Sequence, residues 1–353
     1  MPNLLSADIG GTKTLVELSR YSQNTCTSLR KKKYISADYA NFEAIIKSFL
    51  QANESIDLAC IAIAGPIVNT PTKQTASVTN LPWNMCSESL SKAFSIPAVH
   101  FINDFQAMGY AIEHLSNDDL DVLQAGYPQT QGVRAVIGAG TGLGEAILVS
   151  SSDSRPTLST SASAHSASSY QVIATEGGHV DFAANSEIEL ALYQYLNKSY
   201  DHVSYERILS GAGLAQVFSF LWECNEKEKN DLYQTIINHE DPASAISEAG
   251  TNETHAIAEQ ALSLFMTIYG AKAGNLALNC IPQGGLYVSG GIASKNLSFL
   301  KRSQFLSAFN AKGRMAPLLE TIPVYVITNP DTGLIGATQH AITQINLTNT
   351  NLN

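Results

Sequence analysis

Two glycine-rich turns in the sequence carry residue types that can hold phosphate groups. Residues 8–14 read Asp-Ile-Gly-Gly-Thr-Lys-Thr and lie between two short apolar runs. Glycine has no Cβ, so backbone N–H groups at such a turn can approach phosphate oxygens closely, and a nearby carboxylate can orient Mg²⁺ through water. The alternative is a plain hairpin turn. The candidate phosphate ligands are Asp8, which is also the candidate metal ligand through water, Gly10, Gly11, Thr12 and Lys13.

The second turn, residues 138–144, reads Gly-Ala-Gly-Thr-Gly-Leu-Gly. Glycines at alternate positions cost conformational entropy, which favours a closely approaching ligand over a merely flexible turn. A strand pattern follows the turn, and a Rossmann or P-loop site would need a helix there. We therefore predict a second phosphate loop. Its candidate ligands are Gly138, Gly140, Thr141 and Gly142, and the pair Gly290-Gly291 after a later strand either admits the flat face of a nucleotide or forms a turn.

Asn103 and Asp104 stand between a short strand and a helical pattern. In an α/β layer this is a usual place for a polar residue exposed in a cleft. Asn and Asp are also favoured as helix N-caps, so one of the two can cap the helix while the other acts in chemistry.

A third polar group comes from two later segments. Glu176 and His179 bracket two glycines, and Glu206 lies in Tyr-Glu-Arg before Ile-Leu-Ser-Gly. This mixture of donors and acceptors suits a polyhydroxyl ligand, whereas a metal site would need a third ligand at suitable spacing. For Glu206 the alternative is a favourable charge at a helix start.

The elements that must position these residues follow from hydrophobic periodicity. Strands at 4–8 and 14–19 form a hairpin, followed by a helix at 42–50, strands at 58–64 and 98–102, and a helix at 105–115. A strand–glycine turn–strand unit recurs at 134–150, which suggests two similar α/β domains. The later elements are helices at 187–196, 206–224, 253–281 and 333–345 and strands at 286–289 and 322–327.

Composition excludes several classes of protein. The 353 residues suggest two domains, and a net charge of −10 argues against nucleic acid or an anionic membrane as a partner. The basic run at 30–33 is expected on an exposed strand edge, where lysine discourages aggregation. Five dispersed cysteines fit reduced thiols in the cytoplasm. No apolar run is long enough to span a membrane, no signal peptide is recognisable, and residues 150–169 form a Ser-rich loop.

Taken in order, these motifs resemble the bacterial glucokinases of the hexokinase–actin–Hsp70 ATPase superfamily. The resemblance extends over most of the chain, and its most specific segments are Glu-Gly-Gly-His at 176–179 and Tyr-Glu-Arg-Ile-Leu-Ser-Gly at 205–211. One departure is Lys13-Thr14-Leu15, where such glucokinases often continue Asn-Ala-Arg. That form is closer to the repressor–kinase branch, but the Cys-rich zinc motif and DNA-binding extension of that branch are missing.

The resemblance implies two ribonuclease-H-like (actin/hexokinase-type) α/β domains around a central cleft. The small domain would comprise 1–112, completed by a C-terminal helix at about 328–353, and the large domain 113–327. It implies ATP, Mg²⁺ and glucose, and a homodimer as the family expectation, for which the apolar helix at 253–281 offers an interface. Asp104 would accept the proton of the sugar 6-hydroxyl, and the other hydroxyls would be held by Asn103, Glu176, His179 and Glu206.

Three other functions remain open from the sequence. A kinase for another hexose or an amino sugar would share this fold, because the shape of the pocket decides between epimers. A non-catalytic sugar sensor would be expected to carry a DNA-binding extension. An ATPase of the chaperone or actin type would leave the Glu176, His179 and Glu206 group without a purpose.

Overall fold

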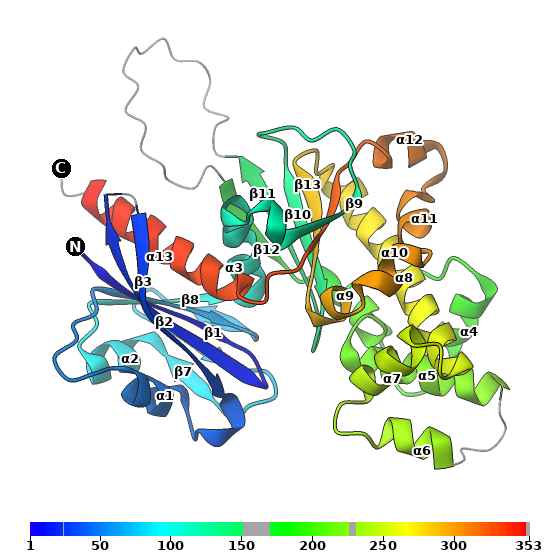
Figure 1. Cartoon of the computed structure of the whole chain (residues 1–353), viewed down its shortest axis with the longest axis horizontal. Helices are drawn as coiled ribbons and strands as arrows, with labels where there is room; N and C mark the ends of the chain where they lie inside the picture. Colours follow the sequence, from blue (N-terminus) through cyan, green and yellow to red (C-terminus); the bar gives the residue numbers. More distant parts are fainter. Residues whose placement is uncertain (24, 151–169, 226–230, 351–353) are drawn as a thin grey trace, which may run out of the picture. The chain divides into compact units, whose positions relative to one another are not determined.

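A computed structural model describes residues 1–23, 25–150, 170–225 and 231–350 (Figure 1). Its internal contacts divide the chain into two units. The first comprises 1–116, 148–174 and 329–353, and the second 117–147 and 175–328. The fold is α/β, as predicted, and each unit contains a mixed sheet. Apart from Ser150, the predicted Ser-rich loop lies outside the described residues.

The first unit is built on a five-stranded sheet with the order β3-β2-β1-β4-β8. The predicted hairpin is confirmed, because β1 and β2 pair antiparallel on either side of the glycine turn, while β1, β4 and β8 run parallel. A three-stranded sheet accompanies it. The strands are β1 (Asn3–Ile9), β2 (Lys13–Ser22), β3 (Thr25–Ile35), β4 (Leu58–Ile63), β5 (Ile67–Asn69), β6 (Gln74–Ser77), β7 (Asn84–Cys86) and β8 (Ala98–Asn103).

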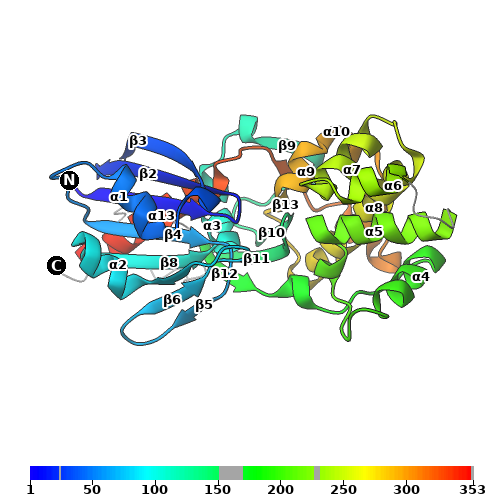
Figure 2. The ribbon, with the colours of Figure 1, turned by 90° about the horizontal axis from the view of Figure 1, so that it is seen from below.

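Helices cover both faces of this sheet (Figures 1 and 2). The interior strand β4 reads Leu-Ala-Cys-Ile-Ala-Ile and is buried throughout. Its alternate residues Ala59, Ile61 and Ile63 join a core with helices α1 and α2, and the others join a core with α3 and α13, as expected for a strand covered on both sides. The helices are α1 (Phe42–Phe49), α2 (Ser87–Phe94), α3 (Asp104–Ala111) and α13 (Thr332–Thr350).

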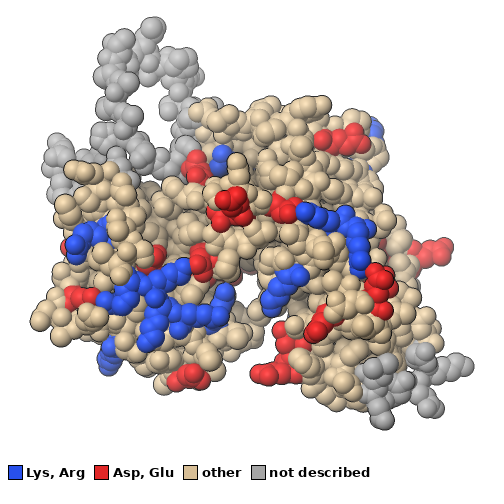
Figure 3. Space-filling model, viewed as in Figure 1, with Lys and Arg blue, Asp and Glu red and all other residues tan. Residues whose placement is uncertain are grey.

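The basic run at 30–33 lies on β3, which is the edge strand, as predicted. Lys and Arg side chains gather over this part of the first unit (Figure 3). The Arg30 guanidinium pairs with Glu54 and lies 4.6 Å from the Phe49 ring centroid, and Lys31 pairs with Asp331. These contacts and the exposed position support a role in protecting the edge.

The second unit is built on the six-stranded sheet β12-β11-β10-β13-β14-β9. Strands β10, β13 and β14 are parallel, and β9 pairs antiparallel with β14. The strands are β9 (Leu120–Gln124), β10 (Arg134–Ala139), β11 (Leu143–Ser150), β12 (Tyr170–Thr175), β13 (Gly285–Ser289) and β14 (Val324–Ile327). Strand β11 crosses the boundary between the units, and all of β12 except Thr175 is counted with the first unit. The helices are α4 (Glu187–Leu196), α5 (Gly211–Asn225), α6 (Asp231–Ile237), α7 (Pro242–Thr251), α8 (Ala256–Cys280), α9 (Gly291–Lys295), α10 (Leu297–Arg302), α11 (Phe305–Asn310) and α12 (Ala316–Leu319).

Two predicted helix starts are wrong. The helix expected from 206 begins at Gly211, because Ser210 Oγ accepts a hydrogen bond from Gly213 N at 3.0 Å and thereby caps it. The helix expected from 253 begins at Ala256 and is capped by His255. Before it lies α7, whose Asp241-Pro242 start is a usual N-terminal pair.

The long helix α8 is an internal element of the second unit. Gly270 and Gly274 lie where an added Cβ would come within 2.0 Å of Phe305 O and 2.4 Å of Phe309 O, so the backbone of α11 packs directly on α8. Most of the apolar side chains of α8 are buried in the core. It therefore does not present the apolar interface expected of it from sequence. No helix in the described part of the chain is long and apolar enough to cross a membrane.

Candidate active site

The first glycine turn is held in shape by one serine. Gly10 N donates to Lys13 O at 2.9 Å, and Ser36 N donates to Thr12 O at 3.1 Å. The Ser36 hydroxyl donates to Gly10 O at 3.0 Å and lies 3.0 Å from Thr14 Oγ1. The side chain of Thr12 is exposed. The Ser36 hydroxyl is therefore bonded to both Thr14 Oγ1 and Gly10 O on the inner side of the turn. The outer side remains accessible to a ligand.

The carboxylate of Asp8 lies against the first turn of α13. A Cβ on Gly333 would come within 2.6 Å of Asp8 Oδ2, so only glycine fits there. Burial raises the pKa of Asp8 to about 6, the nearby Lys13 ammonium lowers it, and Asp331 raises it further. Desolvation of the charged form is the main cause. The site thus holds a carboxylate whose charge is poorly compensated by the protein.

Of the two roles that the sequence left open for Asn103 and Asp104, the structure assigns the capping role. Asn103 is the N-cap of α3, and its side-chain oxygen accepts from Phe105 N at 2.9 Å. Gln106 completes a capping box, since its side-chain oxygen accepts from Asn103 N at 3.2 Å. Asp104 is the first helical residue, and its side chain is only partly buried. The capping role therefore falls to Asn103.

The sheet brings Asp8 and Asp104 to the same edge. Ile9 pairs with Ile63, and Ile63 pairs with Asn103, at the carboxyl ends of three parallel strands. Neighbouring strands lie roughly 5 Å apart, so Ile9 and Asn103 are about 10 Å from each other. In open α/β sheets this edge is where ligands bind.

The second glycine loop is open at its centre. Gly140 N donates to Gly142 O, and Gly211 N donates to Gly140 O, both at 2.8 Å. No atom lies within 4 Å of an added Cβ at Gly140, and Thr141 is exposed. Gly142 has a different constraint, since a Cβ there would come within 2.5 Å of Glu206 Oε2. The loop is therefore anchored at its sides and accessible at its tip.

Gly290 and Gly291 lie beside this loop in the second unit. Gly138 pairs with Ser289, the last residue of β13. Gly290 has φ +87°, and a Cβ there would come within 2.3 Å of Ala139 O. Gly291 begins α9, and no atom lies within 4 Å of its Cβ position. The close approach of Ala139 O thus explains why residue 290 is glycine. The backbone at Gly291 is open beside the loop.

Glu176, His179 and Glu206 form one group around the imidazole. His179 Nε2 lies 3.8 Å from Glu176 Oε2, and His179 Nδ1 lies 3.9 Å from Glu206 Oε1. The Glu206 side chain is 29% exposed and that of Glu176 84% exposed. Glu206 Oε2 also accepts from Leu143 N at 2.9 Å. One sugar-binding candidate of this unit, Glu206, is therefore hydrogen-bonded to its glycine loop. No group of three or more described residues is arranged to hold a metal ion.

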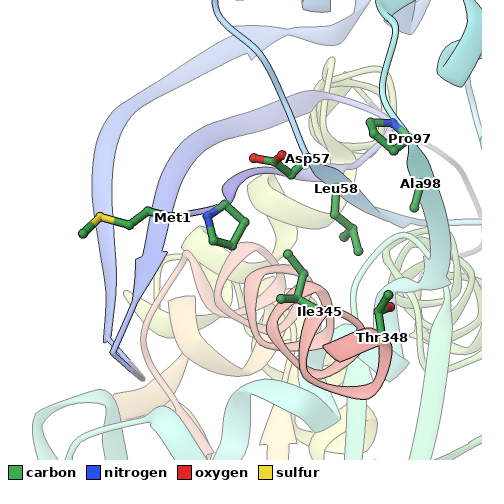
Figure 4. Close-up of a pocket in the computed structure, with 8 residues that line it drawn as sticks. Met1, Asp57, Leu58, Pro97, Ala98, Ile345 and Thr348 are labelled. Carbon is green, nitrogen blue, oxygen red and sulfur yellow. The ribbon is translucent and has the colours of Figure 1, made fainter. Parts of the chain in front are cut away.

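Two hollows are relevant to this assignment. A cavity of about 320 Å³ in the second unit is lined by His179 and Glu206 together with residues 199–202, 204 and 207. A larger one of about 410 Å³ lies in the first unit between Met1, Leu58, Ala98 and Ile345 (Figure 4). Leu58 and Ala98 begin β4 and β8, whereas Asn103 ends β8. The larger cavity is therefore at the opposite edge of the sheet from the candidate residues.

Comparison with known proteins identifies the family of this chain. The family model described as Glucokinase matches residues 5–344. The chain belongs to the glucokinase family. Glucokinases from Nostoc punctiforme and from Synechocystis sp. are 42% and 38% identical to it. The alignments cover 96% of this chain and 98% of the first relative, and 95% of this chain and 96% of the second.

Solved structures of glucokinases share the fold. A glucokinase from an Antarctic psychrotroph is 29% identical, with a TM-score of 0.77 over 97% of this chain and 99% of that one. A glucokinase from Balamuthia mandrillaris, solved in complex with glucose, is 23% identical, with a TM-score of 0.74 over 97% and 94% of the two chains. At that identity the second likeness supports the fold alone.

Sequence reasoning in this glucokinase-family chain missed Ser36, and it did not connect Gly333 with Asp8. Ser36 is fully buried, and its contact with Gly10 spans 26 residues of sequence, so no local pattern identifies it. Gly333 was a better clue, since a glycine in the first turn of a helix indicates that something approaches closely. Here that neighbour is the Asp8 carboxylate.

Proposed function

We propose that this chain is an ATP-dependent glucokinase, which transfers the terminal phosphoryl group of ATP to the 6-hydroxyl of glucose and releases ADP. One observation carries the proposal: Glu176 and Glu206 flank the His179 imidazole, and Glu206 accepts a hydrogen bond from Leu143 N of the glycine loop. A polyhydroxyl-binding group joined to a phosphate-binding loop is what a sugar kinase requires. The family match over nearly the whole chain supports the same activity.

In this proposal Asn103, Glu176, His179 and Glu206 bind the sugar hydroxyls and leave the 6-hydroxyl toward Asp104. The bond from the 6-oxygen to the terminal phosphorus forms as the bond from that phosphorus to the bridging oxygen of ADP breaks. Asp104 accepts the hydroxyl proton. Such reactions depend mainly on positioning and on neutralising charge.

The phosphates are assigned to backbone N–H groups in both units, with Gly10, Gly11, Thr12 and Lys13 in the first and Gly138, Gly140, Thr141 and Gly142 in the second. Gly290 and Gly291 would lie near the nucleoside. Asp8 fits Mg²⁺, because this ion is usually held by one or two carboxylates with substrate phosphates and keeps several waters. When bound, the ion would neutralise phosphate charge.

A substrate panel tests the activity. Purified protein is supplied with ATP and, in separate reactions, glucose, other hexoses and amino sugars, and ADP release is followed. We expect the highest kcat/KM with glucose and a 6-phosphate product. A higher value for an amino sugar would correct the substrate, and no turnover with any sugar would contradict the proposal in favour of a sugar sensor.

The cellular setting is also proposed. All five cysteines are free thiols, which fits the reducing cytoplasm.

The family expectation of a homodimer stands as a proposal, and α4 offers apolar surface for it, because Ile188, Leu190 and Tyr193 are exposed. Sedimentation of the wild type tests whether the protein is a dimer, and sedimentation of Leu190→Glu tests whether α4 forms the interface. A dimer that the variant dissociates supports this face, and a monomeric wild type contradicts the dimer.

A further inference from the structure

A buried ion pair lies beneath the candidate sugar-binding turn. Lys272 Nζ is 2.8 Å from Glu145 Oε1, and the two side chains are 4% and 3% exposed. Glu145 belongs to β11, directly after the second glycine loop, and Lys272 to the middle of α8. Nothing in the proposed mechanism uses either residue.

The carboxylate of Glu145 supports the start of the turn. A Cβ on Gly177 would come within 2.0 Å of Glu145 Oε2, so the turn rests directly on that oxygen. Thr175 Oγ1 donates to Glu145 O at 3.3 Å and accepts from Gly177 N at 3.3 Å. Gly178 packs in the same way, since its Cβ would come within 2.0 Å of Leu143 O. Glu176 and His179 are therefore displayed by a turn seated on residues 143–145.

The lysine end of the pair reaches the segment that carries Glu206. Lys272 Nζ lies 5.1 Å from the ring centroid of Tyr205, the residue before Glu206. Asn275 Nδ2 donates to the Tyr205 hydroxyl at 3.1 Å, and Lys312 Nζ donates to Asn275 Oδ1 at 2.7 Å. The two segments are also joined to each other, because Tyr205 N donates to Val180 O at 3.1 Å. One charge pair thus contacts the supports of all three sugar-binding candidates.

Stability alone is a poor reason for such a pair. Removing two charges from water is costly, and apolar side chains of similar volume often replace a buried ion pair without loss of stability. What an apolar pair cannot do is direct a carboxylate oxygen at the turn or an ammonium at the ring of Tyr205. A site whose ligands must be held within a fraction of an ångström needs such direction.

We propose that Glu145 and Lys272 are positioning residues that hold Glu176, His179 and Glu206 in the geometry that binds glucose. This inference rests on the proposed glucokinase function. Since the pair lies under the sugar-binding turn, its loss is expected to affect glucose binding more than ATP binding.

The test replaces both charges with apolar groups of similar volume. In the double variant Glu145→Met, Lys272→Met we expect a Tm close to that of the wild type. We expect the calorimetric Kd and the KM for glucose to rise about tenfold, as on losing one well-directed hydrogen bond. The KM for ATP should change much less. Lys301→Met is the control, because it removes the exposed Lys301–Asp121 pair of the same unit, and it should leave the glucose Kd unchanged.

A folded double variant with the glucose Kd and KM of the wild type would overturn the inference. If the double variant does not fold, Glu145→Asp decides, since it keeps the charge but withdraws the carboxylate from Gly177 by one methylene. That variant should fold and still bind glucose more weakly, and wild-type glucose affinity in it would equally overturn the inference. A wild type that does not phosphorylate glucose would contradict the proposed function instead.

Discussion

The two glycine turns of this chain occupy equivalent places in two similar sheets. The first joins β1 to β2 in the order β3-β2-β1-β4-β8, and the second joins β10 to β11 in the order β12-β11-β10-β13-β14. In each sheet the next strand, β4 or β13, runs parallel to the first strand and is followed within two residues by a glycine, Gly65 or Gly290. The repeat recognised in the sequence as one strand–turn–strand unit therefore extends over five strands.

The surroundings of the two turns differ. The turn of the first unit is closed from within by Ser36 and has carboxylates nearby at the sheet edge, Asp8 and Asp104. The loop of the second unit is open at Gly140 and bonded to Glu206. Under the proposed function, the same sheet topology therefore positions catalytic carboxylates in one unit and a hydroxyl-binding group in the other.

The largest expected effect tests the chemical half of this comparison. Asp104→Asn should lower kcat by roughly 10²–10⁴-fold, the usual contribution of a general base, while the glucose Kd changes little, because the amide keeps the size and hydrogen-bonding capacity of the side chain. Steady-state kinetics and calorimetry measure the two effects. Asp331→Asn is the control, because Asp331 comes after β14, the fifth strand of the other sheet, as Asp104 comes after β8. The kcat of this variant should fall far less. Activity retained in Asp104→Asn would remove Asp104 from the role of base.

A second pair of variants tests the recognition half. Glu176→Ala and Glu206→Ala should each raise the KM for glucose by about 10–100-fold, the cost of losing hydrogen bonds to a charged group. Only Glu206 accepts from Leu143 N, so Glu206→Ala should also raise the KM for ATP several-fold. Identical effects of the two variants on the KM for ATP would mean that the hydrogen bond between Leu143 N and Glu206 does not contribute to ATP binding.

Local patterns were sufficient for much of this architecture. The signals for β4 and α4 lie in the elements themselves: an apolar run in β4, and an N-cap and hydrophobic periodicity in α4. The predicted bounds of α4, 187–196, agree with the structure. The Asn103-Asp104 pair was also placed correctly between strand and helix. Such features depend on neighbours a few residues away, which a single sequence displays.

Contacts between distant residues could not be predicted in this way. The bond from Ser36 to Gly10 spans 26 residues and that from Leu143 to Glu206 spans 63. Glu145 read as an ordinary strand residue and Lys272 as an ordinary helix residue, although they form a buried pair. The start of α5 was misplaced because Glu206 has high helix propensity, whereas the cap at Ser210 precedes two unfavourable glycines.

The role of Ser36 in closing the first turn predicts a smaller effect. Ser36→Ala removes the bond to Gly10 O and the contact with Thr14 Oγ1. We expect the KM for ATP to rise several-fold and the Tm to fall, because one buried hydrogen bond contributes about 0.5–1.5 kcal/mol. Ser6→Ala is the matched control, since Ser6 is equally buried and its hydroxyl has no partner among the described residues. Equal effects of the two variants would show that the loss is one of packing.

The smallest expected effect concerns Asp8, the second-last residue of β1. The second-last residue of β10 is Gly138, which has no side chain. The pKa of Asp8 is raised from 3.8 to about 6 in the folded protein, so the folded state binds the proton more tightly than the unfolded state. The charged carboxylate therefore costs stability that is fully present above pH 6 and disappears as the pH falls toward 3.8. Asp8→Asn should have a Tm a few degrees above that of the wild type at neutral pH, with a gap that closes on acidification, and thermal unfolding across this range measures it. A gap independent of pH would show that the charge of Asp8 is not its cause. If the variant also loses phosphoryl transfer, the first turn keeps a destabilising carboxylate for its chemistry, and that is the sharpest difference between the two turns.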